Sequence, residues 1–523
     1  MTRRSGWILP ALVLVAGGLR VAAVLVTAPV DDAFITYRYA GNIAAGHGFV
    51  YNLGERVLGT TTPFFTLLLT PFAGLGFPLE KSAAALAVLA SLGTMGLLFS
   101  FVRRATRRAV GGRDDVAESA GLLAATLYAL FYAQIASCGY GMETQVFELA
   151  AMAALAAATA GRPRLAALAA GLAALTRPEG FLLAMLLGIA ALVRWMRGRG
   201  PFPWGAVGVF AAIVLPWIAF ATLYFGSFIP NSALAKASQR SISAGDWGRF
   251  FVWRNPVIAL AWTVSAVGAA WAWARRSASL GLMAFWAAAY AFFFLVARPP
   301  FLGNWYFPPL AGPLMGLVAA GMLPAALRCR PIRSGPAFVV LPAALRDHFP
   351  RPGLALTAFA ALWAALLAIS VPRALQSAAW SKQIAERVYL PMAVWTRDHT
   401  APEEVVEMSD IGYVGFISGR TILDAGGLVS PELWRDYASH ADDPRKDVHF
   451  TLDRKPAVLL LPMGHGIYQR FVAAGLLDVY EPMARFRAEG SAELPRLGAL
   501  LPPEQTTGRL VPDFIALRRI EER

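Results

Sequence analysis

The stretch WILPALVLVAGGLRVAAVLVTAPVDDAFITYRYAGN, residues 7–42, joins a long apolar segment to a pair of adjacent aspartates. An apolar run of about 20 residues is typical of a transmembrane helix. Asp31 and Asp32 follow that run directly, where removing a carboxylate from water costs free energy. The stretch therefore predicts a membrane protein that holds two carboxylates at the edge of the bilayer.

Apolar composition extends over most of the chain. Of its 523 residues, 57% are hydrophobic and 15% are charged, and the mean hydropathy is +0.51. A soluble protein of this length would need more polar surface, so the fold class expected is a polytopic α-helical membrane protein. We expect about eleven transmembrane helices, at 7–27, 83–102, 119–136, 143–160, 165–176, 180–196, 205–225, 257–274, 278–297, 308–326 and 353–371.

Basic side chains are concentrated in the same part of the chain. Up to Val371 there are 29 Lys and Arg against 12 Asp and Glu, a net charge of +17, whereas from Pro372 onward there are 18 against 21, a net charge of −3. The basic residues fall in every second loop between apolar segments. This distribution is typical of cytoplasmic loops, so we expect the N-terminus, with Arg3 and Arg4, in the cytoplasm. It also argues against a nucleic-acid partner.

The segment 61–79 is apolar, but three prolines and two glycines interrupt it. If it were a span, the arginine-rich loop RRATRRAVGGR (103–113) would lie outside, against the positive-inside rule. We therefore expect an interfacial or re-entrant hairpin on the outer side. Eleven spans then place the C-terminal residues on the outer side of the inner (plasma) membrane.

Two domains are expected. Residues 1–371 would form the transmembrane domain, and residues 372–523 a soluble α/β domain in the periplasm or outside the cell. The second part has short β-like runs, AVLLLPM (457–463) and DFIALRR (513–519), separated by helical and turn segments. The outer loops of the membrane domain would be 28–82, 137–142, 176–180, 226–256 and 298–308.

Three roles are open for the aspartate pair. Neighbouring carboxylates repel each other, and burial raises the pKa of at least one, which suits a general base. Carboxylate oxygens also suit a divalent cation, so a cation at Asp31 and Asp32 remains an option. The third role is structural, because aspartate favours the N-terminus of a helix.

The residues after the pair predict an amphipathic helix. Its apolar side chains, including Tyr39, would face the bilayer, whereas Arg38, Asn42 and the carboxylates would face a cavity. Glycines then break regular structure, and Glu55 follows in the same loop. Arg38, Tyr39, Asn42 and Glu55 are candidates for ligand binding beside the pair.

Two short outer turns place charge at the membrane edge. SCGYGMET (137–144) carries Glu143, which either favours the N-terminus of the next helix or contributes to a site. LTRPEGF (175–181) carries Arg177 and Glu179. These two residues either pair with each other or present a positive charge that holds a lipid phosphate.

A longer outer loop, LYFGSFIPNSALAKASQR (223–240), adds basic residues. Asn231 follows a proline in a turn, and Lys236 and Arg240 come later. Together with backbone N–H groups, the two basic side chains would suit a phosphate. The alternative is a loop whose lysine is merely solvated.

Aromatic residues mark the last outer loop, RPPFLGNWYFPPL (298–310). Trp305 and Tyr306 either anchor the chain at the membrane interface or stack on a sugar ring.

Motifs for cofactors are missing from the sequence. Cys138 and Cys329 are expected on opposite sides of the membrane, and neither cysteines nor histidines have the spacing of a metal site. AGGL (425–428) lacks the spacing and the lysine of a phosphate-binding loop. We therefore expect no cofactor, apart from the divalent cation left open at the aspartate pair.

The outer loops together resemble the GT-C superfamily of polytopic glycosyltransferases, in its terminal β-1,2-arabinofuranosyltransferase-like branch. The resemblance covers most of the chain as short islands, of which the first is the most specific. The islands are DDAFITYRYAGNIAAGHGFVYNLGERVLGTTTP (31–63), GMET (141–144), LTRPEG (175–180), YFGSFIPNSALAK (224–236) and DIGYVGFISGRTILDAGGL (410–428).

The resemblance implies a sugar donor linked to a polyprenyl phosphate, and an acceptor that is an envelope glycan, lipid or protein. The acidic residue of the first loop, which corresponds to Asp31 or Asp32, would act as general base in an inverting displacement. Basic side chains would stabilise the departing lipid phosphate. The candidates are Arg177, Lys236 and Arg240, with Lys236 inside a matching island.

Two other classes of protein remain alternatives. A transporter or flippase for a lipid-linked saccharide would show charges or broken helices near the bilayer midplane and an internal repeat. A non-catalytic envelope assembly protein would not need Asp31, Asp32, Glu143, Arg177 and Lys236 on one side. The glycosyltransferase interpretation accounts best for polar outer loops above an apolar body.

Overall fold

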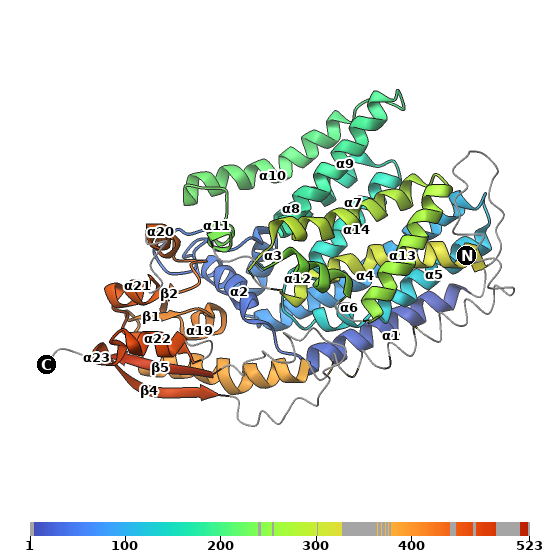
Figure 1. Ribbon diagram of the computed structural model, residues 1–523. Coiled ribbons are helices and arrows are strands. Elements are labelled where there is room, and N and C mark those ends of the chain that lie inside the picture. The colour runs from blue at the N-terminus through green and yellow to red at the C-terminus, as the bar shows by residue number, and fades with distance from the viewer. Residues whose placement is uncertain are drawn as a thin grey trace.

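The computed structural model divides into a helical bundle and a C-terminal unit built on a sheet (Figure 1). The described elements up to residue 326 are all helices, and every strand in the described part of the chain comes after residue 404. The residues described are 5–238, 242–253, 256–300, 302–326, 363, 368, 372, 375, 378–439, 446–463, 467–487 and 513–520.

The first part consists of helices of very different length. The α-helices are α1 (Ser5–Val26), α2 (Asp31–Ala44), α3 (Pro63–Gly74), α4 (Leu79–Ala109), α5 (Asp114–Ala129), α6 (Tyr132–Ser137), α7 (Thr144–Thr159), α8 (Pro163–Thr176), α9 (Glu179–Met196), α10 (Trp204–Phe225), α11 (Asn231–Ser238), α12 (Ala244–Gly248), α13 (Pro256–Ala274), α14 (Ala278–Ala297) and α15 (Ala311–Ala326). Short turns of other helix types are η1 (Arg249–Trp253), η2 (Asn304–Tyr306) and η3 (Pro308–Leu310).

Six of these helices are long and apolar enough to cross a membrane, counted over the described residues: α1, α4, α9, α10, α13 and α14. The apolar helices α3, α7 and α8 are shorter, with 12, 16 and 14 residues. The segment predicted at 119–136 is broken near Leu130 into α5 and α6. The segment predicted at 353–371 lies almost wholly outside the described residues. The expected hairpin at 61–79 contains α3, which is too short to span a bilayer.

The bundle packs through small residues. α4 lies against α5 and α7, α7 against α8, and α13 against α15. The buried faces of α4 and α5 are rich in alanine, which allows helix backbones to approach closely. Arg20 of α1 is fully buried, and its guanidinium donates to Ser91 Oγ at 2.7 Å and to the Ala129 carbonyl at 3.1 Å. These bonds tie α1 to α4 and to the end of α5.

The C-terminal unit is a five-stranded mixed sheet with helices around it. The sheet order is β2-β1-β3-β5-β4, in which β1 is parallel to β2 and β3, and β5 is antiparallel to β3 and β4. The strands are β1 (Val405–Met408), β2 (Thr421–Asp424), β3 (Val458–Pro462), β4 (Tyr480–Arg487) and β5 (Asp513–Arg519). The helices are η4 (Ala385–Tyr389), α18 (Leu390–His399), α19 (Ile411–Ser418), α20 (Pro431–Ser439), α21 (Lys446–Arg454), α22 (Ile467–Ala473) and α23 (Leu476–Val479).

Helix α2 lies between the bundle and the sheet, next to α19 (Figure 1). Ile35 and Tyr39 pack in one core with strand residues such as Val406. Phe34 packs on Tyr413, with ring centroids 3.9 Å apart. The prediction that the apolar face of this helix meets the bilayer is therefore wrong, because the C-terminal unit covers that face.

Candidate functional site

Asp31 opens α2 and holds the beginning of another helix. Its Oδ2 accepts the backbone N–H of Gly412 and its Oδ1 that of Tyr413, both at 2.9 Å. These N–H groups lie in the first turn of α19, where a helix leaves its N–H groups without an internal partner. Burial raises the pKa of Asp31 well above the ordinary carboxyl value, and the nearby Asp410 adds to the rise. Asp31 thus caps the N-terminus of α19, at residues 381 and 382 positions later in the sequence, and not the N-terminus of its own helix α2.

Asp32 is placed differently from its neighbour. Within the described part of the chain no hydrogen bond reaches its carboxylate, and the side chain is only partly buried. Burial raises its pKa, and the positive charge of Lys236 opposes that rise. Of the two aspartates, Asp32 is therefore the one whose carboxylate remains available for chemistry.

A third carboxylate, Asp410, joins the pair from the C-terminal unit. Burial raises its pKa, the hydrogen bond from Tyr389 lowers it, and the charge of Asp32 raises it. The Tyr389 hydroxyl donates to Asp410 Oδ2 at 2.8 Å. Sequence reasoning missed Asp410 as a site residue, although it opens the fifth matching island, because an aspartate before a short apolar helix resembles an ordinary cap.

Arg177 is neutralised by two buried carboxylates. Its guanidinium donates to Glu143 at 2.9 Å and to Glu179 at 2.8 Å, and all three side chains are at most 5% exposed. The guanidinium carbon lies 5.8 Å from the centre of the Phe147 ring and 5.4 Å from that of Tyr306. Two roles were left open for Arg177, and in the structure it forms the ion pair with Glu179. Glu143 is a second partner, so the charge of Arg177 is not free for a lipid phosphate.

The polar residues of α2 serve the fold rather than a cavity. Arg38 donates to the Arg420 carbonyl at 2.7 Å, and its guanidinium carbon lies 4.2 Å from the centre of the Tyr51 ring. The Tyr39 hydroxyl donates to a carbonyl in the following loop, and Asn42 donates to the carbonyl of Tyr51. The expectation that Arg38 and Asn42 face a cavity is wrong, because the loop and the C-terminal unit fill that space.

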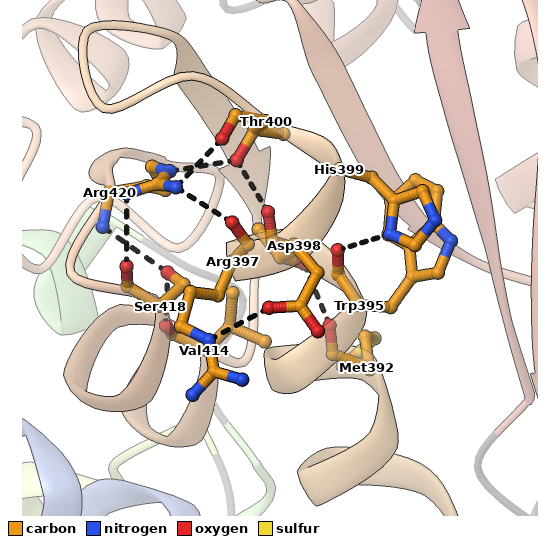
Figure 2. Close-up of polar contacts among 10 residues, drawn as sticks. Met392, Trp395, Arg397, Asp398, His399, Thr400, Val414, Ser418 and Arg420 are labelled. Carbon is orange, nitrogen blue, oxygen red and sulfur yellow. Dashed lines mark hydrogen bonds and ion pairs between the residues drawn. The ribbon is translucent and has the colours of Figure 1, made fainter.

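Arg420 continues this link into the C-terminal unit. Figure 2 shows its guanidinium at the end of α18, where it donates to the carbonyls of Arg397 and Thr400, both at 2.7 Å, and to Thr400 Oγ1 at 2.9 Å. The last carbonyls of a helix lack internal partners, so a cation there stabilises the helix. Arg38, Arg420 and α18 thus form one chain of contacts from α2 to the helix that precedes the sheet.

Asn231 connects α11 to the C-terminal unit. Its Nδ2 donates to the carbonyls of Gly427 and Leu428 at 2.7 and 2.9 Å. Lys236 lies on the same eight-residue helix, and its charge acts on Asp32. Asn231 therefore holds the helix that carries Lys236, instead of standing free for a ligand.

The remaining candidates are dispersed. Tyr306 is buried beside Arg177 and within electrostatic reach of Asp32, whereas Trp305 is partly buried. Glu55 is exposed and accepts a hydrogen bond from Asn52 in its own loop. Arg240 lies outside the described residues.

No group of three or more acidic, histidine or cysteine side chains in the described residues has the geometry to hold a metal ion. Asp31 is engaged by backbone N–H groups, which compete with a cation for its oxygens.

One protein family and one relative each match part of this chain. Residues 378–501 match a family described as a domain of unknown function, DUF8728. The chain is also 31% identical over 244 residues to the terminal beta-(1->2)-arabinofuranosyltransferase of Mycobacterium tuberculosis. That match covers 43% of this chain and 36% of the relative, so it spans about a third of the relative's length.

Solved structures match over much more of the chain. ArnT from Cupriavidus metallidurans, solved with bound undecaprenyl phosphate, is 16% identical, with a TM-score of 0.58 and 98% of both chains covered. The oligosaccharyltransferase of Archaeoglobus fulgidus in its apo form is 14% identical, with a TM-score of 0.55 over 89% of this chain and 70% of that one. The chain thus has the helical GT-C fold of these proteins, and six of its described helices are long and apolar enough to cross a membrane. The resemblance to the GT-C superfamily is confirmed at the level of the fold.

Proposed function

We propose that this protein is an integral membrane glycosyltransferase that moves a sugar from a polyprenyl-phosphate donor to an acceptor hydroxyl. The observation that carries the proposal is that Asp32, at the beginning of α2, lies within electrostatic reach of Lys236 on α11. A carboxylate with a raised pKa and no hydrogen-bonded partner in the described residues lies within electrostatic reach of a cation. This arrangement supplies a base for the acceptor and a positive charge for an anionic leaving group.

Each residue has a defined part in an inverting displacement. The Asp32 carboxylate takes the proton of the acceptor hydroxyl, and the acceptor oxygen forms a bond to the anomeric carbon. The bond from that carbon to the phosphate oxygen breaks, and its electron pair leaves with the polyprenyl phosphate. Lys236 stabilises the departing anion, and Asp32 later gives its proton to solvent.

The relatives support the donor class. ArnT binds undecaprenyl phosphate in its solved structure, and the Archaeoglobus fulgidus oligosaccharyltransferase AglB has been solved with a dolichol-phosphate and an inhibitory peptide. The mycobacterial relative is by name an arabinofuranosyltransferase. The proposed sugar is accordingly an arabinofuranose or a similar pentose or hexose, and the acceptor an envelope glycan, lipid or protein.

The proposed topology follows from the distribution of Lys and Arg among the loops between apolar segments. Eleven transmembrane helices with a cytoplasmic N-terminus place Asp32 and the C-terminal unit on the outer side of the plasma membrane. The basic residues of 103–113 then lie in the cytoplasm. A lipid-linked donor would enter from the outer leaflet and meet the acceptor at the same face.

Two measurements test the function. Purified protein is extracted with organic solvent, and mass spectrometry identifies any polyprenyl-phosphate sugar that copurifies. The protein is then incubated with that donor and cell-envelope acceptors, and release of polyprenyl phosphate is followed. Donor binding and acceptor-dependent release are expected. Donor binding without release or glycosylated product would contradict the proposal and favour a carrier for lipid-linked saccharides.

A further inference from the structure

We infer that α19, within the domain of unknown function, is part of the catalytic site: it holds Asp31 and so presents Asp32 to the acceptor. This inference rests on the proposed function. Gly412 is a positioning residue in this account, because it acts on the reaction only through the backbone and carboxylate of Asp31.

The closeness of Gly412 to Asp31 requires a glycine. A Cβ at position 412 would lie 1.8 Å from the Asp31 carbonyl oxygen and 2.9 Å from the Asp31 carboxylate carbon. No side chain fits at such distances, so any substitution must push α19 away from α2. The two N–H bonds to Asp31 depend on the same approach.

Gly415, one turn later, makes a second contact of the same kind. A Cβ there would lie 1.9 Å from the Tyr51 hydroxyl and 2.7 Å from Arg38 Nη1. The Tyr51 hydroxyl donates to the Ile411 carbonyl at 2.7 Å, so the first turn of α19 is held from both sides. The two glycines of GYVG (412–415) in the fifth island are therefore explained by packing, because both lie where α19 contacts residues of the first outer loop.

A third contact ties the other side of the site to the same unit. The loop after β2 accepts both Asn231 hydrogen bonds, and Asn231 begins the helix that carries Lys236. That loop is itself held by Asp424, whose carboxylate accepts the N–H groups of Gly426 and Val429 at 2.7 and 3.0 Å. The C-terminal unit thus contacts the elements bearing both the base and the cation.

The first test compares Gly412→Ala with Gly188→Ala in the full-length protein. Position 188 has nothing within 4 Å of an added Cβ, which makes it a matched control for glycine replacement. Gly412→Ala is expected to lower kcat about a hundredfold with little change in the KM for the donor, because a shift near 1 Å misplaces the base. Gly188→Ala should keep wild-type kcat.

The second test measures hydrogen exchange, which does not depend on activity. Asp31→Asn should speed exchange of the Gly412 and Tyr413 amides, since it removes their charged acceptor, whereas Asp32→Asn should leave them protected. In a double-mutant cycle, Asp31→Asn and Gly412→Ala should together cost no more kcat than the larger single loss.

Three results would overturn the inference: wild-type kcat in Gly412→Ala, unchanged exchange in Asp31→Asn, or losses that multiply in the double variant. If the wild-type protein transfers no sugar, the proposed function fails, and the exchange comparison still decides whether Asp31 holds α19.

Discussion

Asp31 Oδ2 accepts the backbone N–H of Gly412 at 2.9 Å, joining two residues that lie 381 positions apart. Because the beginnings of α2 and α19 both meet at Asp31, the partial positive charges of two helix N-termini offset part of the cost of burying its carboxylate. Asp32 has no such bonds within the described residues and stays available. The pair is therefore asymmetric: one aspartate anchors a helix, and its neighbour is the proposed base.

The pH dependence of transfer should reflect Asp32. A general base works only when deprotonated, and the pKa of Asp32 is raised, so activity should fall as pH decreases through a value above the usual carboxyl range. Lys236 lowers that pKa, so Lys236→Met should move the acidic limb to higher pH in addition to lowering kcat. The measurement is kcat/KM against pH for both proteins. An acidic limb that does not move in Lys236→Met would contradict the assignment.

Removing Arg177 should destabilise the membrane bundle. Arg177→Ala leaves Glu143 and Glu179 buried without their cation, a change that typically costs about 3–5 kcal/mol. Thermal unfolding in detergent should show a markedly lower Tm. Arg162→Ala is the control, because that arginine is exposed and should leave Tm nearly unchanged. Equal Tm values for the two variants would mean that the ion triad does not stabilise the bundle.

Asn231→Ala should weaken catalysis through Lys236. The substitution removes two hydrogen bonds between α11 and the loop at Gly427 and Leu428, each worth about 1 kcal/mol. We expect a lower kcat, measured by release of polyprenyl phosphate. Ser227→Ala, which removes two hydrogen bonds that stay within the turn before the helix, should behave as wild type. A kcat equal to wild type in Asn231→Ala would show that this contact does not position the lysine.

The proposed topology predicts which cysteines a membrane-impermeant thiol reagent reaches in intact cells. In a background with Cys138→Ser and Cys329→Ser, Glu481→Cys on the sheet should be labelled from outside. Arg104→Cys, near the C-terminal end of α4, should be labelled only after the membrane is permeabilised. Both positions are exposed, so burial does not protect either one. Labelling of Arg104→Cys in intact cells would invert the topology.

Local features of the fold were predictable from the sequence. Apolar runs long enough to cross a membrane can be found by composition, which is why the six long apolar helices of the described residues, α1, α4, α9, α10, α13 and α14, coincide with predicted segments. The proline-interrupted stretch 61–79 was likewise expected not to cross, and it contains only the short α3. Among the site residues, Asp31 and Asp32 stood out because carboxylates are rare beside a transmembrane segment.

Long-range contacts were not predictable from one sequence. Periodicity showed an apolar face on α2, but it could not tell whether lipid or the C-terminal unit covers that face. Arg38 was expected in a cavity, because the residues around it in the sequence do not indicate its hydrogen-bond acceptor. That acceptor is the Arg420 carbonyl, 382 positions later in the chain. Asp410 was overlooked for the same reason, since its importance comes from its closeness to Asp31 in space.

The most direct test of the account is single-turnover transfer by purified Asp32→Asn, with a polyprenyl-phosphate sugar and its acceptor. Loss of the general base should reduce the rate by about 10²–10⁴-fold. The protected amides of α19 and donor binding should remain as in the wild type. Wild-type turnover in Asp32→Asn would contradict the central claim that Asp32 is the base.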